Sequence, residues 1–410
     1  MNIRYFCAPR LREYLSSMRP GILDFLGESP LIRPLAIQTT YPGLAFDFNM
    51  GFRLQIPAGN WHVKILDYDS EVIFFDEDIS DTVLISLEKF FVRWQFMLWL
   101  DGELVFEHVF APEGWKVHIN YPASGMGDRL VLFPYMEEFR KKWGCQLSCT
   151  VEPYLQEIVN LYYPEIKCCP APNDSYATYF AAPGFSVLFY PEEVRKVPME
   201  KFGQQIFGLS RVAKIIYRPT KPRQIKEPYV CIAAQTSATI KAWLNPDGWN
   251  FVVDYLKSLG YRVLCIDRDR QQTDHGFKVK MPQGAEDFTG NLPLSERINL
   301  LAFADFFIGM PSGLSWLAWA ADCPVILISG ITAPWLEFSG SYRVINRLVC
   351  FGCHNDIKIP WGDFEKCPRH KGTDRAYECS RKISARQVVQ AIDQLIADKR
   401  TGRFSYPEFL

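Results

Sequence analysis

The chain has 410 residues, which is enough for two or three domains. Hydrophobic residues make up 48% of the chain and aromatic residues 15%, so large cores can form and extended disorder is excluded for most of the length. The net charge of -1 leaves no basic excess to neutralise a phosphate backbone, which argues against nucleic acid as a partner.

The first 120 residues divide into an arm and a β-rich segment. Residues 1–40 are irregular and interrupted by prolines, and they lack the apolar run of a signal peptide. From 41 to 120 apolar and polar residues alternate, and Asp101-Gly102 between two such runs predicts a hairpin. We therefore expect a small antiparallel sandwich or barrel of five to seven strands at 41–120.

Residues 121–216 alternate between strand and helix patterns. A strand ending at Tyr121 leads into a predicted helix from Asp128 to Trp143, which Gly144 terminates. A strand at 147–151, a helix at 153–163 and strand candidates at 178–180 and 187–189 follow. This alternation indicates a βα domain with a parallel sheet.

A second βα series fills residues 217–410, after a linker at 217–228 that is rich in Pro, Lys and Arg. Strands are predicted at 229–234, 262–266, 306–308 and 325–329, and helices at 249–259, 293–304, 312–321 and 384–398. The overall prediction is an α/β chain with two Rossmann-like domains behind an antiparallel β domain. Two such domains would form a ligand cleft at the carboxyl ends of their strands.

The turn Gly125-Met-Gly127-Asp128 stands between a predicted strand and a predicted helix. Its glycines allow the backbone to approach a ligand closely. Asp128 is expected at or next to the helix N-cap, where the free N–H groups and the helix dipole favour an ionised carboxylate. Such a carboxylate could accept the proton of an attacking hydroxyl group. The alternative is an ordinary aspartate cap.

The turn Ser312-Gly313-Leu314-Ser315 follows the strand predicted at 306–308 and opens a helix. Gly313 removes a side chain, so the N–H groups at the helix start could hold a diphosphate. A capped turn that binds nothing is the alternative, because one glycine is less specific than a full glycine-rich fingerprint.

Small polar residues and one lysine follow the strand predicted at 229–234, in the segment from Thr236 through Lys241 to Trp243. Lys241 could hold a phosphate as a point charge, or it could be a solvated loop lysine. Asp267-Arg268-Asp269 ends the next strand, where an acidic residue can bind ribose hydroxyls. The same triplet also resembles an Asp-x-Asp motif that binds metal ions in some enzymes.

Four of the twelve cysteines are clustered with the spacing Cys350-x2-Cys353-x13-Cys367-x11-Cys379. In a reduced cytoplasm such spacing indicates a tetrathiolate site. Four thiolates suit zinc or iron and leave no open coordination position, so the role would be structural. Unpaired surface thiols or a redox switch are the alternatives.

Several of these segments resemble the bacterial autotransporter heptosyltransferase family. The resemblance is carried by Ser258-Leu-Gly-Tyr-Arg-Val-Leu-Cys-Ile-Asp-Arg-Asp269, Gly284-Ala-Glu-Asp287-Phe-Thr-Gly290, Ile308-Gly-Met-Pro-Ser-Gly-Leu-Ser-Trp316 and the Cys367-Pro-Arg-His-Lys-Gly segment with its cysteines. It extends from about Phe46 to about Ile392 and omits only the N-terminal arm and the C-terminal end.

The resemblance implies a GT-B-type pair of Rossmann domains, an ADP-heptose donor and Ser or Thr acceptors on an autotransporter passenger protein. It also implies iron at residues 350–379 and a large ring-shaped homo-oligomer. By motif, Asp128 matches the catalytic base and Lys241 the lysine on the donor phosphate. The residues expected to contact the donor are Gly127, Thr236, Trp243, Asp267, Arg268, Asp287, Ser312, Gly313, Leu314 and Ser315.

One departure bears on the acceptor. Related lipopolysaccharide heptosyltransferases carry Asp-Thr-Gly-Leu-Ser-His in the diphosphate loop, whereas this chain has Pro311 and Trp316 at the ends of that motif. A lipid acceptor is therefore disfavoured. Two other functions stay open: a lipopolysaccharide-type transferase that uses another nucleotide sugar, and a non-catalytic assembly module stabilised by metal.

Overall fold

The computed structural model of the chain describes residues 34–49, 51–86, 90–122, 125–181, 192–210, 214–274, 277–360 and 366–402, and the backbone of strand β1 (Ile3–Tyr5). The chain divides into two compact units. Unit 1 comprises residues 1–124, 132–194 and 201–212, and unit 2 comprises residues 125–131, 195–200 and 213–410. The strand candidate at 187–189 lies outside the described residues.

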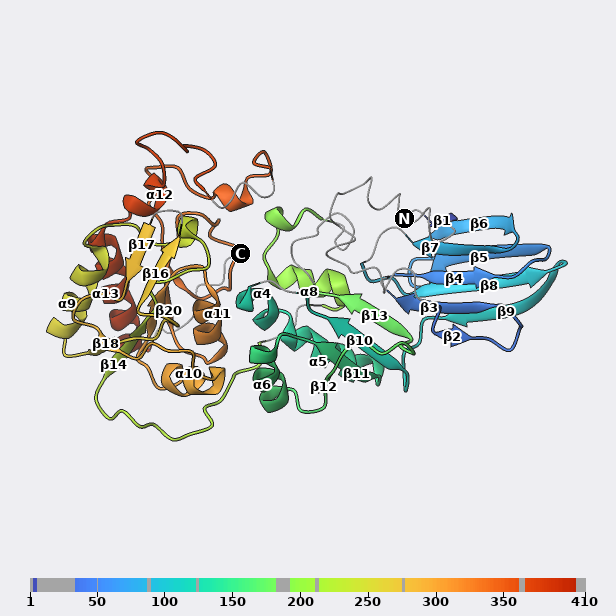
Figure 1. Cartoon of the computed structure of the whole chain (residues 1–410), viewed down its shortest axis with the longest axis horizontal. Coiled ribbons are helices and arrows are strands. Elements are labelled where there is room, and N and C mark those ends of the chain that lie inside the picture. The colour runs from blue at the N-terminus through green and yellow to red at the C-terminus, as the bar shows by residue number, and fades with distance from the viewer. Residues whose placement is uncertain are drawn as a thin grey trace. The chain divides into compact units, whose positions relative to one another are not determined.

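Unit 1 contains a nine-stranded mixed sheet with the strand order β1-β7-β4-β3-β13-β10-β11-β12, and β2 pairs with β3 (Figure 1). Its antiparallel part comprises β1, β2 (Ile37–Gln38), β3 (Ala45–Asn49), β4 (Arg53–Ile56) and β7 (Thr82–Ser86). Its parallel part comprises β10 (Lys116–Asn120), β11 (Gln146–Thr150), β12 (Lys167–Cys168) and β13 (Ala177–Phe180).

The two parts of this sheet join where β3 pairs in parallel with β13, with Phe48 opposite Ala177. All five residues of β3 are buried, as expected for a strand inside a sheet. The antiparallel segment therefore continues into the parallel sheet, whereas the sequence analysis expected a small antiparallel sandwich or barrel at 41–120. Alternation within single strands does not reveal such a long-range pairing.

A second sheet of unit 1 is antiparallel, with the order β6 (Ile73–Ile79), β5 (Trp61–Asp67), β8 (Trp94–Leu100) and β9 (Glu103–Val109). The predicted hairpin between β8 and β9 is confirmed, because Asp101 and Gly102 both adopt positive φ, 51° and 87°. Aromatic rings fill the space between the two sheets. The Phe96 ring lies 5.2 Å from the rings of both Phe46 and Phe52.

The helix predicted from Asp128 to Trp143 is divided into α4 (Met126–Leu130) and α5 (Phe133–Trp143). Pro134 occupies the first turn of α5, where a missing N–H costs nothing, whereas inside one long helix it would break a backbone hydrogen bond. Gly144 ends α5 in the left-handed conformation, as predicted. The further helical elements along this part of the chain are α6 (Pro153–Tyr162), η1 (Val194–Lys196) and α8 (Glu200–Phe207).

Unit 2 is built on a six-stranded parallel sheet with the order β18 (Glu286–Asp287), β15 (Arg262–Cys265), β14 (Tyr229–Ile232), β19 (Phe307–Gly309), β20 (Val325–Ile328) and β21 (Tyr342–Val344). Numbered from β14, this is the 3-2-1-4-5-6 order of a Rossmann fold. The order reverses between β14 and β19, and such a switch point is where open α/β sheets bind ligands. The Rossmann prediction for 217–410 is therefore confirmed by the strand order.

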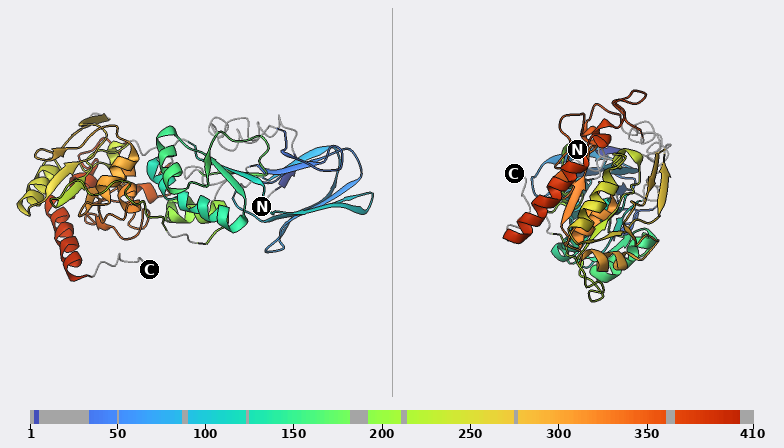
Figure 2. Two further views of the ribbon diagram at one scale, coloured as in Figure 1. Left: turned by 90° about the horizontal axis from the view of Figure 1, so that it is seen from below. Right: turned by 90° about the vertical axis from the view of Figure 1, so that its left-hand side faces the viewer.

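Helices cover both faces of this sheet (Figures 1 and 2). On one face, α9 (Gly248–Ser258) contacts the long helix α13 (Ala385–Thr401), and on the other α10 (Leu294–Leu301) contacts α11 (Gly313–Ala320). Residues of α9 and α13, such as Val252 and Ile392, share one buried core with the strands. Smaller elements are η2 (Thr239–Lys241), the hairpin of β16 (Gln271–Asp274) and β17 (Phe277–Lys280), η3 (Cys353–Asn355) and α12 (Glu378–Arg381).

No helix among the described residues has the length and apolar character needed to cross a bilayer.

Candidate active site and metal-binding finger

Asp128 lies in the first turn of α4, three residues after the N-cap, which is Gly125. Its Oδ2 accepts a hydrogen bond from the Gly125 N–H at 3.0 Å. The sequence analysis placed Asp128 at or next to the cap, and the true start of the helix is earlier because Gly125 adopts extended backbone there. The carboxylate is half-buried, and one of its oxygens supports the helix start.

The start of α4 packs against the start of α11, and glycines on both helices permit this contact. A Cβ atom on Gly313 would lie 2.7 Å from the Met126 Cβ, and one on Gly127 would collide with the Trp316 ring. Both glycines were predicted to contact the donor, and the structure gives each of them a packing role. The consequence is that Asp128, next to Gly127, lies close to the first turn of α11.

The first turn of α11 offers backbone donors more than side chains. Ser312 is the N-cap, but its side chain makes no capping hydrogen bond. The buried Ser315 hydroxyl donates to the Met310 carbonyl at 2.6 Å and is therefore used inside the turn. The N–H groups of Gly313 and Leu314 lie in the first turn, where no carbonyl of the same helix can accept their hydrogen bonds. They are therefore suited to bind an anion.

Two other predicted donor residues stabilise the segment after β14 through internal hydrogen bonds. Asp267 is buried and accepts hydrogen bonds from the N–H groups of Ala234 at 2.9 Å and Gln235 at 3.2 Å. Burial raises its pKa to about 6. The Thr236 hydroxyl donates to the Ala238 carbonyl at 2.7 Å. Both side chains thus have internal partners, and the predicted contacts of Asp267 with ribose and of Thr236 with the donor stay predictions.

Trp243 is also an internal residue. Its side chain is buried, its ring packs edge-on against Trp249 at 5.3 Å, and its indole N–H donates to the Ile383 carbonyl at 2.9 Å. The apolar and polar parts of this indole are both used inside unit 2. Its predicted contact with the donor stays a prediction.

Lys241 ends η2, beyond β14, and among the described residues it forms no ion pair. Burial, the Lys241 ammonium and the Arg195 guanidinium lower the pKa of His354 to about 4. β14 and β19 are adjacent at the switch point. Lys241 and the start of α11 thus follow neighbouring strands, which is the arrangement expected of a phosphate site.

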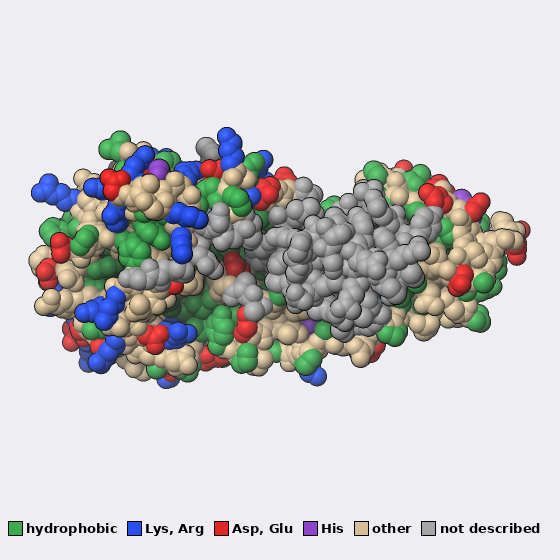
Figure 3. Space-filling view, turned by 45° about the horizontal axis from the view of Figure 1, so that its top comes forward, with side chains coloured by type: hydrophobic (Ala, Val, Ile, Leu, Met, Phe, Trp, Pro, Cys, Tyr) green, Lys and Arg blue, Asp and Glu red, His purple; other side chains and the backbone are tan. Residues whose placement is uncertain are grey.

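Arg268 and Asp287 lie further along the sheet. Arg268 is largely exposed and pairs with Asp269 at 3.0 Å. Asp287 accepts hydrogen bonds from the backbone and hydroxyl of Thr289 at 3.0 and 2.6 Å and pairs with Arg270. Both are accessible to a nucleotide, and their contact with it stays a prediction. Lys and Arg side chains are frequent on the face of unit 2 that Figure 3 shows.

We call residues 350–381 the finger, of which 361–365 lie outside the described residues. Its only helical elements are η3 and α12 in the part that the structure describes. Cys353, Cys367 and Cys379 are buried and Cys350 is half-buried. Burial and the charges of the other three thiols raise the pKa of Cys379 to about 12.

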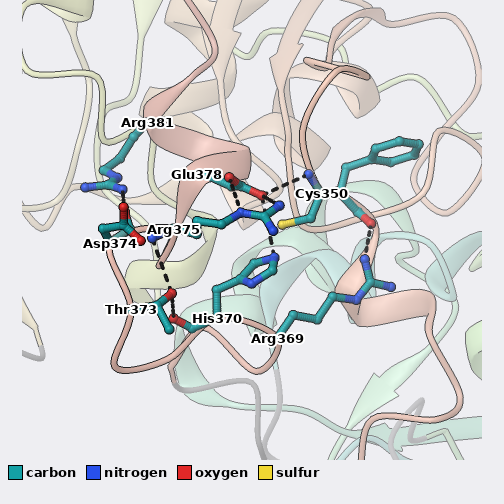
Figure 4. A network of polar contacts seen from close by, with 9 residues as sticks. Cys350, Arg369, His370, Thr373, Asp374, Arg375, Glu378 and Arg381 are labelled. Atoms are coloured by element: carbon teal, nitrogen blue, oxygen red, sulfur yellow. Dashed lines mark hydrogen bonds and ion pairs between the residues drawn. The ribbon is translucent and has the colours of Figure 1, made fainter.

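Two residues that the sequence analysis missed surround Cys350 (Figure 4). Potential ligand atoms of Cys350, His370 and Glu378 all lie within 4.8 Å of one another. Glu378 accepts hydrogen bonds from the Cys350 N–H at 3.3 Å and from Arg375 at 2.6 and 3.0 Å. Their positions, three residues after Cys367 and one before Cys379, could have suggested a role.

The donor set of the finger fits a soft or borderline metal ion. None of the described cysteines forms a disulfide, so the four clustered thiols are available as thiolates. Thiolate sulfur favours iron or zinc over magnesium or calcium. A cation would also remove the repulsion between these buried sulfurs when they ionise. His370 and Glu378 lie beside this set and can support it.

Comparisons with known proteins agree with the resemblance seen in the sequence. Residues 41–102 match the family model of the glycosyltransferase TibC N-terminal domain, and residues 199–353 match that of glycosyltransferase family 9 (heptosyltransferase). The autotransporter heptosyltransferase TibC of Escherichia coli O78:H11 is 42% identical over 361 residues, which cover 85% of this chain and 89% of TibC.

A solved structure has the same fold over nearly its whole length. The dodecameric iron-containing heptosyltransferase TibC in complex with ADP-D-beta-D-heptose superposes with a TM-score of 0.83 at 41% identity, covering 90% of this chain and all of that one. A further relative, the inactive autotransporter heptosyltransferase BimC of Burkholderia thailandensis, is 33% identical over 85% of either chain. These identities and coverages show that the chain belongs to the autotransporter heptosyltransferase family.

Proposed function

We propose that the chain transfers heptose from ADP-heptose to Ser or Thr hydroxyl groups of an autotransporter passenger protein. The observation that carries this proposal is the packing of α4 against α11, which brings Asp128 close to the first turn of α11. A carboxylate and a set of anion-binding N–H groups are the two elements that the transfer needs. The relatives described above supply the identity of the donor and the acceptor.

In the proposed reaction, the acceptor oxygen attacks the anomeric carbon as the bond from that carbon to the β-phosphate oxygen breaks. Asp128 accepts the hydroxyl proton, and ADP departs with the bonding electron pair. Lys241 and the N–H groups of Gly313 and Leu314 stabilise the charge that grows on the phosphate. A single displacement of this kind inverts the anomeric centre. The chain's own cationic and N–H groups provide this stabilisation, so the proposal places no metal at the reacting centre.

The finger is proposed to hold one iron ion through Cys350, Cys353, Cys367 and Cys379, with zinc as the alternative. Iron is favoured because the TibC relative contains it. Bound metal would cross-link a segment that has little regular structure and would supply folding energy. We expect Cys367→Ser to lose the metal, as measured by elemental analysis and absorption spectra. Cys169→Ser, outside the cluster, should retain it, and loss of metal from both variants would contradict the assignment.

We further propose that the chain works in the cytoplasm as a large ring-shaped homo-oligomer. Reduced thiols are needed for the metal site and are maintained in that compartment. The assembly is suggested by the dodecameric TibC relative. Sedimentation velocity on the purified protein would measure the oligomer directly.

The direct test of function is to incubate the protein with ADP-heptose and a passenger protein and to measure intact mass. The proposal requires the passenger to gain whole heptosyl units. A panel of other nucleotide sugars tests the lipopolysaccharide-type alternative, which requires transfer from one of them instead. The non-catalytic alternative is favoured by one observation, the inactive relative BimC. It requires that no donor yields product.

A further inference from the structure

The segment that carries Lys241 is held by two parts of the finger. We call residues 236–245 the lysine loop. Its only helical element is the single turn η2, in which Lys241 follows Ile240 directly. A short turn of this kind has few backbone hydrogen bonds of its own, so neighbouring elements must fix its position.

The first contact is apolar. Ile240 belongs to a small buried cluster with Ile331, Cys353 and Ile359, and Ala238 packs against its edge. Cys353 is one of the four clustered cysteines, and it lies in η3. The buried side chain before Lys241 is therefore in the same cluster as a proposed metal ligand.

The second contact is polar and involves Ser380, which directly follows Cys379. The buried Ser380 hydroxyl donates to the Ala242 carbonyl and accepts a hydrogen bond from the Leu244 N–H at 2.8 Å. One side chain thus satisfies two backbone groups immediately after Lys241. Unsatisfied buried backbone groups are costly, so this contact defines the course of the loop strongly.

The finger is itself attached to the sheet at the same place. The Gly352 N–H donates to the Gly330 carbonyl at 2.9 Å and the His354 N–H to the Ile331 carbonyl at 3.0 Å, just beyond β20. A Cβ atom on Gly330 would collide with the Cys379 carbonyl, so Gly330 allows the two segments to meet. The finger therefore contacts both the lysine loop and the segment after β20.

We propose that the metal-loaded finger positions Lys241 for the donor phosphate, through Ile240 on one side and Ser380 on the other. Cys353 and Cys379 are distant in sequence, and a shared metal would fix their separation. Fixing both cysteines fixes both contacts to the lysine loop. This inference rests on the proposed role of Lys241, and it adds a function in donor binding to the structural role of the finger.

The experiment uses the full-length, metal-loaded protein and two readouts: ADP affinity by isothermal titration and hydrogen exchange of residues 236–245. Ser380→Ala removes both bonds to the loop. We expect it to weaken ADP binding about tenfold and to speed exchange at the Leu244 amide by a similar factor, with metal content unchanged. Ser384→Ala is the matched control, because the Ser384 hydroxyl caps α13 through Gln387 and forms no hydrogen bond with the loop among the described residues.

A second variant covers the case in which Ser380→Ala fails to fold. Ile240→Val removes one methyl group from the cluster with Cys353 and should shift both readouts in the same direction, by a smaller factor. Removal of the metal by a chelator should also speed exchange at 236–245 and weaken ADP binding. Sedimentation in parallel shows whether the oligomer dissociates.

The inference is overturned if Ser380→Ala or metal removal changes neither ADP affinity nor exchange at 236–245, even if the oligomer falls apart. It is also overturned if Ser384→Ala gives the same changes as Ser380→Ala. Lys241→Ala separates this inference from the proposed function. If that variant binds ADP normally, the role of Lys241 fails, whereas the exchange measurement still tests whether the finger orders the loop.

Discussion

The segments that leave the neighbouring strands β14 and β19 use their polar groups in opposite ways. After β14, the Thr236 hydroxyl bonds to nearby backbone, and Asp267, which follows β15, accepts hydrogen bonds from the N–H groups of Ala234 and Gln235. Among the described residues of that segment, Lys241 is a cation that forms no ion pair. After β19, the first-turn N–H groups of α11 point away from any intrahelical acceptor. The first segment is a scaffold for one lysine, and the second is a backbone anion site.

This difference shows why polar residues at strand ends are ambiguous in a sequence. Asp128 and Asp267 both follow a strand and both were predicted to act on ligand. Asp267 is buried and bonded to two backbone N–H groups, whereas Asp128 is half-buried at the start of a short helix. Burial decides between a scaffold role and a chemical role, and burial depends on tertiary packing.

The largest effect is expected at Asp128. Asp128→Asn keeps an oxygen that can accept the Gly125 hydrogen bond, but it cannot accept the proton of the acceptor. Loss of a general base lowers rates by about 10²–10⁴-fold. We expect kcat for heptose transfer, measured by intact mass, to fall in that range with ADP affinity unchanged. A variant as active as the parent protein would remove Asp128 from the mechanism.

The second effect concerns Asp267 and pH. Burial raises its pKa from 3.8 to about 6, so the folded state holds its proton more tightly than the unfolded state. The stability that this group contributes is complete below pH 3.8 and is lost as pH rises through 6. A difference of roughly two pKa units corresponds to about 3 kcal/mol.

Asp267→Asn removes this titration and serves as the reference. The free energy of unfolding of the parent protein, from urea melts, should fall relative to the variant between pH 4.5 and pH 7. The transfer rate of the variant should stay within a small factor of the parent, because the Asp267 carboxylate is already bonded to the N–H groups of Ala234 and Gln235. A difference in stability that does not change with pH would show that Asp267 is ionised throughout this range. Loss of ADP binding in Asp267→Asn would show that Asp267 contacts the donor.

Local signals in the sequence were sufficient for much of the fold. Asp101-Gly102 specified its hairpin, Gly144 ended its helix, and the alternation after residue 229 indicated a parallel Rossmann sheet. The pairing of β3 with β13 was missed because it joins segments that are about 130 residues apart, and no local pattern encodes a partner. The break between α4 and α5 could have been read from Pro134.

The site was predicted less completely than the fold. The motifs indicated Asp128, Lys241 and the turn at Ser312, but the same motifs contained Trp243 and Asp267, which are internal. Gly127 and Gly313 illustrate the reason. A glycine in a motif indicates that another group approaches the backbone closely at that position. The sequence does not say whether this group belongs to a ligand or to another helix.

The smallest effect is expected where α4 meets α11. Gly313→Ala would bring a methyl group within 2.7 Å of the Met126 Cβ and so force the two helix starts apart. Overpacking of this kind costs about 1–3 kcal/mol, which urea unfolding can measure. The transfer rate should fall as well, because Asp128 moves with α4. Combining Gly313→Ala with Met126→Gly removes the opposing side chain and should restore part of the stability and rate. If the double variant recovers stability without activity, Gly313 acts on the donor directly as well as through packing.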